Sequence, residues 1–321
     1  MEVLLATVLL AFAQPHAQPV LRSDAGPLLP LDAACQPHHP TACRWRVSSP
    51  LLAAWRGGSG SFPASVPGDL ISDLQANGVV PDPWRETNFL DNSSVWTLPD
   101  YSYSRNFTVP TAVAASARLL LVVDSVKMGA MVSLNGVALG NTTDQFLRYE
   151  FDVTDTIQQA VNTLALLFSP TVETAGRFMP CTGGWDWAPW SHTNDSVGAP
   201  TFSKGIVGSV YLLPIEAVAI RHLVPQVHFL GPHPTSPLRD GAHAGFDVAV
   251  RLYLKVVAAV NGTLKVQGSW GGASATATRA LQLTPSDETV VVRQTTAQRA
   301  HCSRLLAAAC SSHRYVVVCR S

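Results

Sequence analysis

The chain has 321 residues, of which 47% are hydrophobic and 14% are charged, and its formal net charge is zero. This length is enough for two domains with sizeable cores. A neutral chain without a stripe of Lys and Arg lacks the electrostatic footprint of proteins that bind nucleic acid or anionic lipid, so we expect no nucleic-acid partner.

The first residues, MEVLLATVLLAFAQPHAQPV, contain an apolar run from Val3 to Ala13. About eleven apolar residues are too few to span a bilayer but suit the core of a signal peptide. Because Glu2 is acidic and no basic residue precedes the run, a buried N-terminal helix is the alternative. We predict a signal peptide over 1–17, a leader over 18–40 and no membrane span.

Five tripeptides fit the N-glycosylation pattern N-x-[ST]. Their asparagines are Asn92, Asn106, Asn141, Asn194 and Asn261. Each tripeptide alone is weak evidence for glycosylation, because the pattern is common by chance. Five of them behind an apolar leader predict the secretory pathway, with a lysosome-like or an extracellular destination. The six cysteines suit an oxidising compartment, although their spacing leaves the pairing open. They contain no C-x-x-C pair, which argues against a zinc site. The glycines of NGVALGN form no G-x-G-x-x-G pattern, so a dinucleotide site is not supported, and we predict no metal and no cofactor.

Short segments rich in β-branched and aromatic residues fill the chain from Trp96 to about Leu213. They are separated by turn residues and show no helical period, which predicts an antiparallel β-sandwich of the jelly-roll kind over 41–215. Two local features stand out. The stretch DLISDLQANG, residues 69–78, has helical spacing, and Asn135-Gly136 is the favoured pair for a two-residue hairpin.

A second unit begins after Pro214. Alternating segments within 216–292 fit part of an immunoglobulin-like sandwich. From about Arg293 the texture changes, and 293–321 has no clear period and is rich in Ala, Ser, Cys and Arg. A disordered tail and a truncated or misread gene model are the two interpretations of this stretch.

The stretch GGWDWAPW, residues 183–190, concentrates three tryptophans around one aspartate. Indole rings lie flat against the C–H faces of sugar rings, and a carboxylate accepts hydrogen bonds from sugar hydroxyls. Trp185, Asp186 and Trp187 therefore suit a sugar site. The alternative is that the tryptophans fill the core of a sandwich while Asp186 caps a turn.

Several stretches, in the same order, resemble the β-mannosidases of glycoside hydrolase family two. GGWDWAPW is similar to the family's W-D-W-G-P signature, with Ala188 in place of glycine. SVPGDLISDLQANGVVPDPW resembles the family's opening turn and helix, and DYSYSRNFTV its next strand, with Tyr101 in place of tryptophan. GIVGSVYL resembles the strand that closes the first domain, although Val207 replaces a tryptophan. The resemblance is close over roughly 60–215 and weak over about 216–292.

The resemblance implies an all-β architecture of a jelly-roll, galactose-binding-like sandwich followed by an immunoglobulin-like sandwich. It also implies that Trp185, Asp186 and Trp187 contact a terminal β-mannose, and that Asn88, in WRETNF, lies near the same pocket. The expected partner is a β-mannoside or a related glycan.

Retaining hydrolysis needs two carboxyl groups about 5–5.5 Å apart. The family places both on a (β/α)8 barrel, and no Asp or Glu of this sequence matches either catalytic motif. We therefore expect the accessory N-terminal part of a β-mannosidase-like exo-glycosidase that is inactive by itself, with no catalytic residue of its own. The alternative is a secreted lectin-like module that binds carbohydrate without hydrolysing it.

Overall fold

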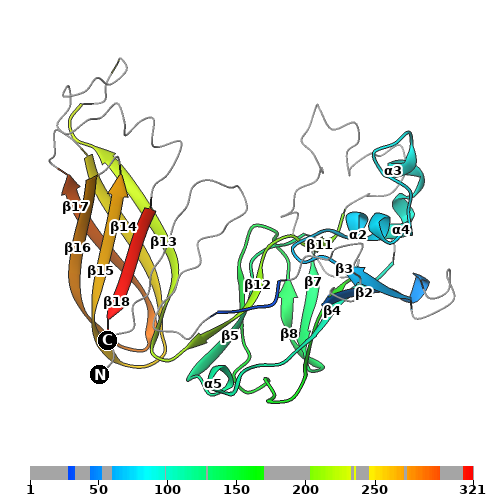
Figure 1. Cartoon of the computed structure of the whole chain (residues 1–321), viewed down its shortest axis with the longest axis horizontal. Coiled ribbons are helices and arrows are strands. Elements are labelled where there is room, and N and C mark those ends of the chain that lie inside the picture. Colours follow the sequence, from blue (N-terminus) through cyan, green and yellow to red (C-terminus); the bar gives the residue numbers. More distant parts are fainter. Residues whose placement is uncertain are drawn as a thin grey trace. The chain divides into compact units, whose positions relative to one another are not determined.

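The computed structural model divides the chain into two compact units, which Figure 1 shows. The sandwich unit comprises Leu28–Leu213, and the C-terminal unit begins at Pro214. The described residues are 28–32, 44–52, 60–97, 99–127, 129–169, 203–232, 235, 246–270, 273–296 and 314–320.

The larger sheet of the sandwich unit has six antiparallel strands in the order β3-β2-β4-β10-β7-β8. They are β2 (Trp45–Ser48), β3 (Ser61–Ala64), β4 (Tyr101–Phe107), β7 (Ala130–Leu134), β8 (Val137–Thr142) and β10 (Asn162–Phe168). The second sheet has the order β1-β12-β5-β9. Its strands are β1 (Leu29–Pro30), β5 (Arg118–Val123), β9 (Tyr149–Asp152) and β12 (Val210–Ile215). A short ladder joins β6 (Val126–Lys127) to β11 (Gly205–Ile206).

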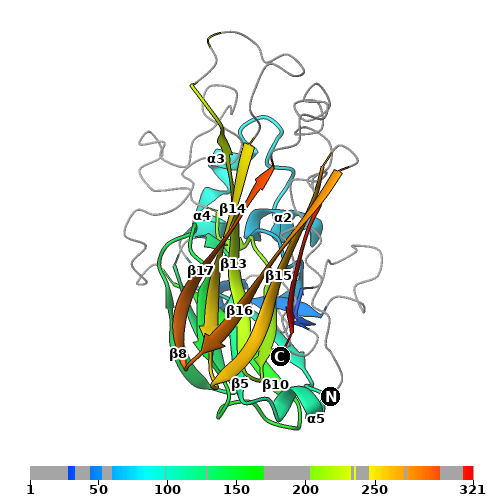
Figure 2. The ribbon, with the colours of Figure 1, turned by 90° about the vertical axis from the view of Figure 1, so that its left-hand side faces the viewer.

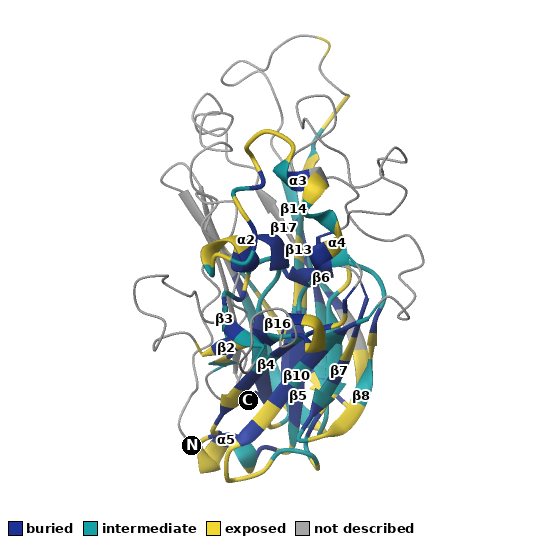
Figure 3. Ribbon diagram, turned by 90° about the vertical axis from the view of Figure 1, so that its right-hand side faces the viewer, coloured by how far each residue is buried: buried dark blue, intermediate teal, exposed yellow. Residues whose placement is uncertain are grey.

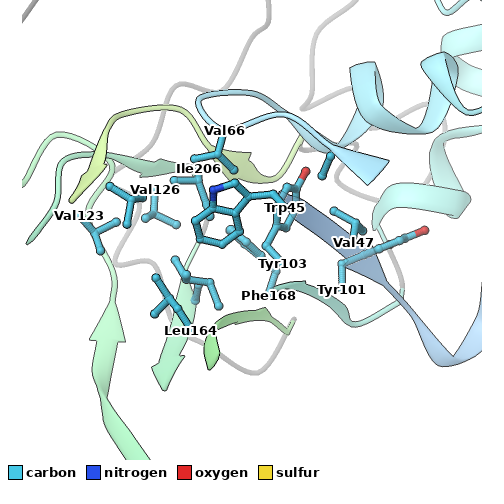
Figure 4. Packing of buried hydrophobic residues seen from close by; sticks show 14 of the residues in the cluster. Trp45, Val47, Val66, Tyr101, Tyr103, Val123, Val126, Leu164, Phe168 and Ile206 are labelled. Carbon is cyan, nitrogen blue, oxygen red and sulfur yellow. The ribbon is translucent and has the colours of Figure 1, made fainter. Parts of the chain in front are cut away.

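The core of the sandwich unit forms where the inner faces of the sheets meet. Side chains on β4 and β10 alternate between buried and more exposed, as the period of two along a strand requires. Trp45 is fully buried, and Figure 4 shows its indole among Val66, Leu164, Phe168 and Ile206. Burying a residue of this size contributes roughly 3 kcal/mol through removal of apolar surface from water.

Short helices flank the sheets, and among those with described bounds Figure 1 shows α2, α3 and α4 at one end of the sandwich unit and α5 at the other. They are α2 (Leu70–Ala76), α3 (Asn88–Asp91), α4 (Ser93–Thr97) and α5 (Thr111–Ala114). The helix predicted over 69–78 is confirmed as α2. Asp69 is its N-cap, and Gly78 follows its C-cap with a φ of 63°, a conformation that glycine adopts without steric cost.

The predicted hairpin at Asn135-Gly136 is also confirmed. Leu134 of β7 pairs with Val137 of β8, and the two turn residues have φ angles of 53° and 81°. The Asn135 side chain also donates to the Thr156 carbonyl oxygen at 2.9 Å, so the turn is tied to the loop that precedes β10.

The C-terminal unit consists of two three-stranded antiparallel sheets, with orders β13-β14-β17 and β16-β15-β18. Figure 2 shows β13, β14 and β17 side by side, with β15 and β16 in the other layer. The strands are β13 (Val218–Phe229), β14 (Phe246–Val256), β15 (Val260–Trp270), β16 (Ala273–Leu283), β17 (Ser286–Thr296) and β18 (Arg314–Arg320). Strand β18 lies within 293–321, the stretch in which the sequence shows no clear period.

The predicted all-β class is confirmed, and the described residues contain no (β/α)8 barrel. Figure 3 shows how burial concentrates on the strands of the sandwich unit, while β8 and α5 carry exposed residues. No helix in the described ranges is long and apolar enough to cross a membrane.

Candidate functional site

The Trp-Asp-Trp stretch predicted to contact sugar lies outside the described residues. Trp185, Asp186 and Trp187 belong to the segment 170–202, so their role stays a prediction. The flanks of that segment are described, because the chain leaves β10 after Phe168 and is described again from Ser203. The attachment of these flanks determines which part of the sandwich unit carries the segment.

The departing flank is fixed beside the helices. Phe168, the last residue of β10, pairs with Tyr101, the first residue of β4. The Tyr101 hydroxyl donates to the Val95 carbonyl oxygen of α4 at 2.6 Å. Phe168 is fully buried and meets Tyr103 edge-on, with 5.5 Å between ring centroids. The departure point is therefore rigidly packed.

The returning flank is held by backbone hydrogen bonds to the start of α2. Leu70 N–H donates to the Lys204 carbonyl oxygen at 2.7 Å, and Gly68 N–H donates to the Ile206 carbonyl oxygen at 2.8 Å. A β-carbon on Gly205 would lie 2.6 Å from the Gly68 carbonyl oxygen, so the approach requires glycine. Both flanks are thus fixed at the end of the sandwich unit that carries α2, α3, α4 and β11, which we call the helical end (Figure 1).

Asp69 joins the cap of α2 to the returning flank. Its Oδ1 accepts from the N–H groups of Ile71 at 3.0 Å and Ser72 at 3.2 Å, and these bonds satisfy free donors of the first helical turn. The Ser203 hydroxyl donates to the same oxygen at 3.2 Å. One carboxylate therefore orients both α2 and the first described residue after 170–202.

Asp73 is a buried acid on the inner face of α2, with 5% of its surface exposed. Its Oδ1 accepts from Ser65 N–H at 2.9 Å, and its Oδ2 accepts from the Tyr103 hydroxyl at 2.9 Å. Burial raises the pKa of Asp73 to about 7, although both hydrogen bonds act in the opposite direction. Burial also raises the pKa of Tyr103 well above its usual value, so Tyr103 is the donor of this pair.

Lys204 is a buried cation at the returning flank. Its Nζ donates to the carbonyl oxygens of Thr97 at 3.1 Å and Pro99 at 3.0 Å, and lies 5.8 Å from the centroid of the Tyr101 ring. Burial lowers the pKa of Lys204 to about 8, and the charge of Asp100 partly offsets that effect. Lys204 thereby ties the returning flank to the end of α4.

Asn88, the other predicted site residue, lies at the helical end at the start of α3 and is half-buried. Its Nδ2 donates to the Asp82 carbonyl oxygen at 2.9 Å, and its backbone N–H donates to the Arg85 carbonyl oxygen at 3.1 Å. The side-chain amide therefore closes the loop 82–88. Contact between Asn88 and a sugar stays a prediction.

The same loop presents a large exposed aromatic ring. Trp84 is 61% exposed, and its backbone N–H donates to the Asp82 carboxylate at 3.0 Å. Arg85 Nε lies 3.3 Å from the other oxygen of that carboxylate. An exposed indole on a braced loop can stack on the C–H face of a sugar.

Sequence reasoning missed the polar framework of the helical end, which consists of Asp69, Asp73, Tyr103 and Lys204. A signal for Asp73 was present, because it falls at position i+3 from Leu70, on the apolar face of the predicted helix. A charged residue on a buried helix face needs polar partners. Tyr103 lies 30 positions away in the sequence, and only the fold identifies it as that partner.

The asparagines of the predicted glycosylation sites differ in how far they are exposed, where the structure describes them. Asn106, Asn141 and Asn261 are exposed, whereas Asn92 is half-buried and donates through Nδ2 to the Asn88 carbonyl oxygen at 2.8 Å. Asn194 lies outside the described residues.

Within the described part of the chain, no group of three or more His, Cys, Asp or Glu residues could hold a metal ion.

Comparisons with known proteins extend this picture. Residues 45–177 match the family described as "Glycosyl hydrolase 2 galactose-binding domain-like". The β-mannosidase of Rattus norvegicus is 30% identical over 240 residues, which cover 64% of this chain and 25% of the relative. The crystal structure of a β-D-mannosidase from Dictyoglomus thermophilum has a TM-score of 0.64 at 19% identity and covers 84% of this chain and 31% of its own. The exo-chitosanase CsxA of Amycolatopsis orientalis has a TM-score of 0.56 at 20% identity over 84% of this chain and 29% of its own.

The two packed sheets define the sandwich unit as a β-sandwich of the galactose-binding kind. The matched residues, 45–177, lie within the sandwich unit, so this unit is the part of the chain that is similar to the galactose-binding-like domain of glycosyl hydrolase family 2. The chain spans about a quarter of the length of the rat β-mannosidase that it matches.

Proposed function

We propose that this chain is the non-catalytic N-terminal part of a β-mannosidase-like exo-glycosidase and supplies the Trp-Asp-Trp segment to a pocket for a terminal β-mannose. Two findings support the proposal, the family match over 45–177 and the identity to the rat β-mannosidase. The observation that carries it is the fixation of both flanks of 170–202 at the helical end.

In this proposal the helical end acts as a rigid base. Lys204 and Asp69 hold the returning flank, and Phe168 anchors the departing one. Such a base restricts the segment before sugar binds, which lowers the entropic cost of ordering it in the complex. Asp186 would then accept hydrogen bonds from sugar hydroxyls, and one of the two indoles would cover the ring face. Bond cleavage would require a carboxyl pair outside this chain.

Binding by the chain tests this role. We expect isothermal titration calorimetry to detect methyl β-D-mannoside and to show that Asp186→Ala weakens its affinity about tenfold or more, because a hydrogen bond to a charged group contributes about 1.5–3 kcal/mol. Asp144→Ala, a change at another carboxylate of the sandwich unit, serves as the matched control. Equal affinity of wild type and Asp186→Ala would assign the aspartate a structural role.

A second measurement compares the affinity of the chain for a β-mannoside with its affinity for a related glycoside. The fold is shared with an exo-chitosanase, so it does not by itself select the sugar. We expect tighter binding of methyl β-D-mannoside than of the corresponding β-D-glucosaminide, and no hydrolysis of an aryl β-mannoside by the chain. Turnover of that substrate would refute the non-catalytic role, and broad glycan binding without a preference for β-mannose would favour the lectin-like alternative.

We also propose passage through the secretory pathway. Expression in a eukaryotic host is expected to yield a glycoprotein whose mass falls after N-glycosidase treatment, because Asn106, Asn141 and Asn261 are exposed. Peptide mass spectrometry should find these three sites occupied. We expect lower occupancy at Asn92, because its side-chain nitrogen donates a hydrogen bond to the Asn88 carbonyl oxygen. Retention of an unmodified chain in the cytosol would contradict this route.

A further inference from the structure

Loop 82–88, at the helical end, places four consecutive exposed residues between two buried ones. Residues 84–87, which we call the tip, are all exposed, whereas Pro83 before them and Phe89 after them are buried. Phe89 belongs to the hydrophobic core of the sandwich unit. The loop is therefore anchored on both sides of an exposed tip.

The backbone of the tip has a conformation that is unfavourable for its sequence. Glu86 has a φ of 51°, in the left-handed region that a residue with a β-carbon adopts only at a steric cost. Hydrogen bonds hold the loop against this cost, because the Asp82 carbonyl oxygen accepts from Arg85 N–H at 3.2 Å and from Asn88 Nδ2 at 2.9 Å. Enforced strain of this kind clusters at binding sites, which makes the tip a candidate binding element.

The strained residue carries an exposed charge that contributes no ion pair to the fold. Among the described residues, Glu86 pairs with no Lys, Arg or His side chain. Its neighbour Arg85 is fixed through Nε, which lies 3.3 Å from Asp82 Oδ2, yet 80% of the Arg85 side chain stays exposed. The tip therefore offers a carboxylate acceptor and a guanidinium donor to solvent, next to the exposed indole of Trp84.

This combination of groups favours a sugar over a protein surface or an anion. Within loop 82–88, which the structure describes in full, Trp84 is the only exposed apolar residue. A protein partner needs a wider apolar patch, and an anion would meet the carboxylate of Glu86. A pyranose needs one flat ring for its C–H face, with donors and acceptors beside it for its hydroxyl groups.

Packing connects this loop to the attachment of the Trp-Asp-Trp segment. The loop leads into α3, and Phe89 of α3 packs against Trp96 of α4, with 5.3 Å between ring centroids. The last residue of α4, Thr97, accepts through its carbonyl oxygen from Lys204 Nζ at 3.1 Å. The loop and the returning flank of 170–202 are therefore fixed to the same helix.

We propose that loop 82–88 is a second sugar subsite, which binds a residue beyond the terminal mannose of the same glycan. The ligand class of the helical end is then a β-mannosyl oligosaccharide. Trp84 stacks on the second ring, and Arg85 and Glu86 bond its hydroxyl groups. This inference rests on the proposed function, which assigns the terminal mannose to the Trp-Asp-Trp segment.

The test compares the affinities of the chain, freed of N-glycans, for methyl β-D-mannoside and for β-1,4-mannotriose by calorimetry. We expect the trisaccharide to bind about tenfold more tightly, because covering one face of the indole removes apolar surface from water. Trp84→Ala should reduce the ratio of the two affinities to about one. Trp84→Tyr should keep most of the wild-type ratio, because its smaller ring can still stack.

Phe146→Ala is the matched control, because Phe146 is a 65% exposed aromatic residue outside the loop. It should leave the ratio at the wild-type value. A ratio that Trp84→Ala does not change, or that Phe146→Ala lowers as much, would overturn the second subsite, and binding of methyl β-D-mannoside would then leave the proposed function intact. Trp84-dependent binding of mannotriose without binding of methyl β-D-mannoside would contradict the pocket for a terminal mannose and retain the loop as a sugar site. Binding of neither sugar would overturn both.

Discussion

Gly205→Ala is expected to destabilise the sandwich unit by about 3 kcal/mol or more. The added β-carbon would lie 2.6 Å from the Gly68 carbonyl oxygen and 2.7 Å from the Asp69 α-carbon, and both obstructing atoms belong to the backbone. Backbone atoms cannot rotate away as a side chain can, so the returning flank must separate from the start of α2. Overpacking of this kind costs about 1–3 kcal/mol and occasionally more.

Thermal unfolding followed by circular dichroism checks this expectation. For a unit of this size, a loss of 3 kcal/mol lowers the midpoint by about 6–12 °C. Ser203→Ala is the matched control, because it removes one 3.2 Å hydrogen bond to Asp69 from the same flank and adds no atoms. We expect its midpoint to fall by only a few degrees. A Gly205→Ala midpoint equal to that of wild type would show that the close approach to α2 is not needed for stability.

Asp73 is expected to make the sandwich unit less stable as the pH rises from about 4 to about 7. The pKa of this carboxyl is raised from 3.8 to about 7 by burial, so between these values the folded state holds a proton that the unfolded state has lost. The free energy of unfolding therefore falls with rising pH, and the loss is complete above about pH 7. Three pKa units correspond to about 4 kcal/mol.

Chemical denaturation at a series of pH values checks the sign and the size of this effect. Asp73→Asn keeps an oxygen that can accept from Ser65 N–H but cannot ionise, so its profile between pH 4 and pH 7 should be flatter. Tyr103→Phe removes a hydrogen bond that favours the ionised form, so the pKa of Asp73 should rise further and the decline in stability should extend above pH 7. Parallel profiles for wild type and Asp73→Asn would contradict the assignment. Of the two destinations that the sequence leaves open, lysosome-like and extracellular, a fold that gains stability toward acidic pH suits the lysosome-like one.

The sequence predicted the elements that depend on local pattern and turn chemistry. The helix over 69–78 was evident because Leu70, Ile71 and Leu74 repeat at helical spacing, and Asn135-Gly136 marked its hairpin because both residues tolerate positive φ. The strands of the sandwich unit were evident from their β-branched and aromatic content. These features arise from interactions between residues close in the chain.

The polar framework of the helical end was beyond such reasoning, because its partners are distant in sequence. Lys204 bonds to carbonyl oxygens more than 100 positions away, and Ser203 bonds to Asp69 across 134 positions. The pattern of residues along the chain does not indicate which of these distant residues come into contact.

The most direct test of sugar binding at the helical end is a titration of the indole-¹⁵N-labelled chain with methyl β-D-mannoside, followed by NMR. Trp185 and Trp187 indole signals, assigned by single Trp→Phe substitutions, should shift with one common dissociation constant, while the signal of the buried Trp45 should stay fixed. Unchanged Trp185 and Trp187 signals at saturating sugar would show that the Trp-Asp-Trp segment does not contact the ligand and would contradict the account.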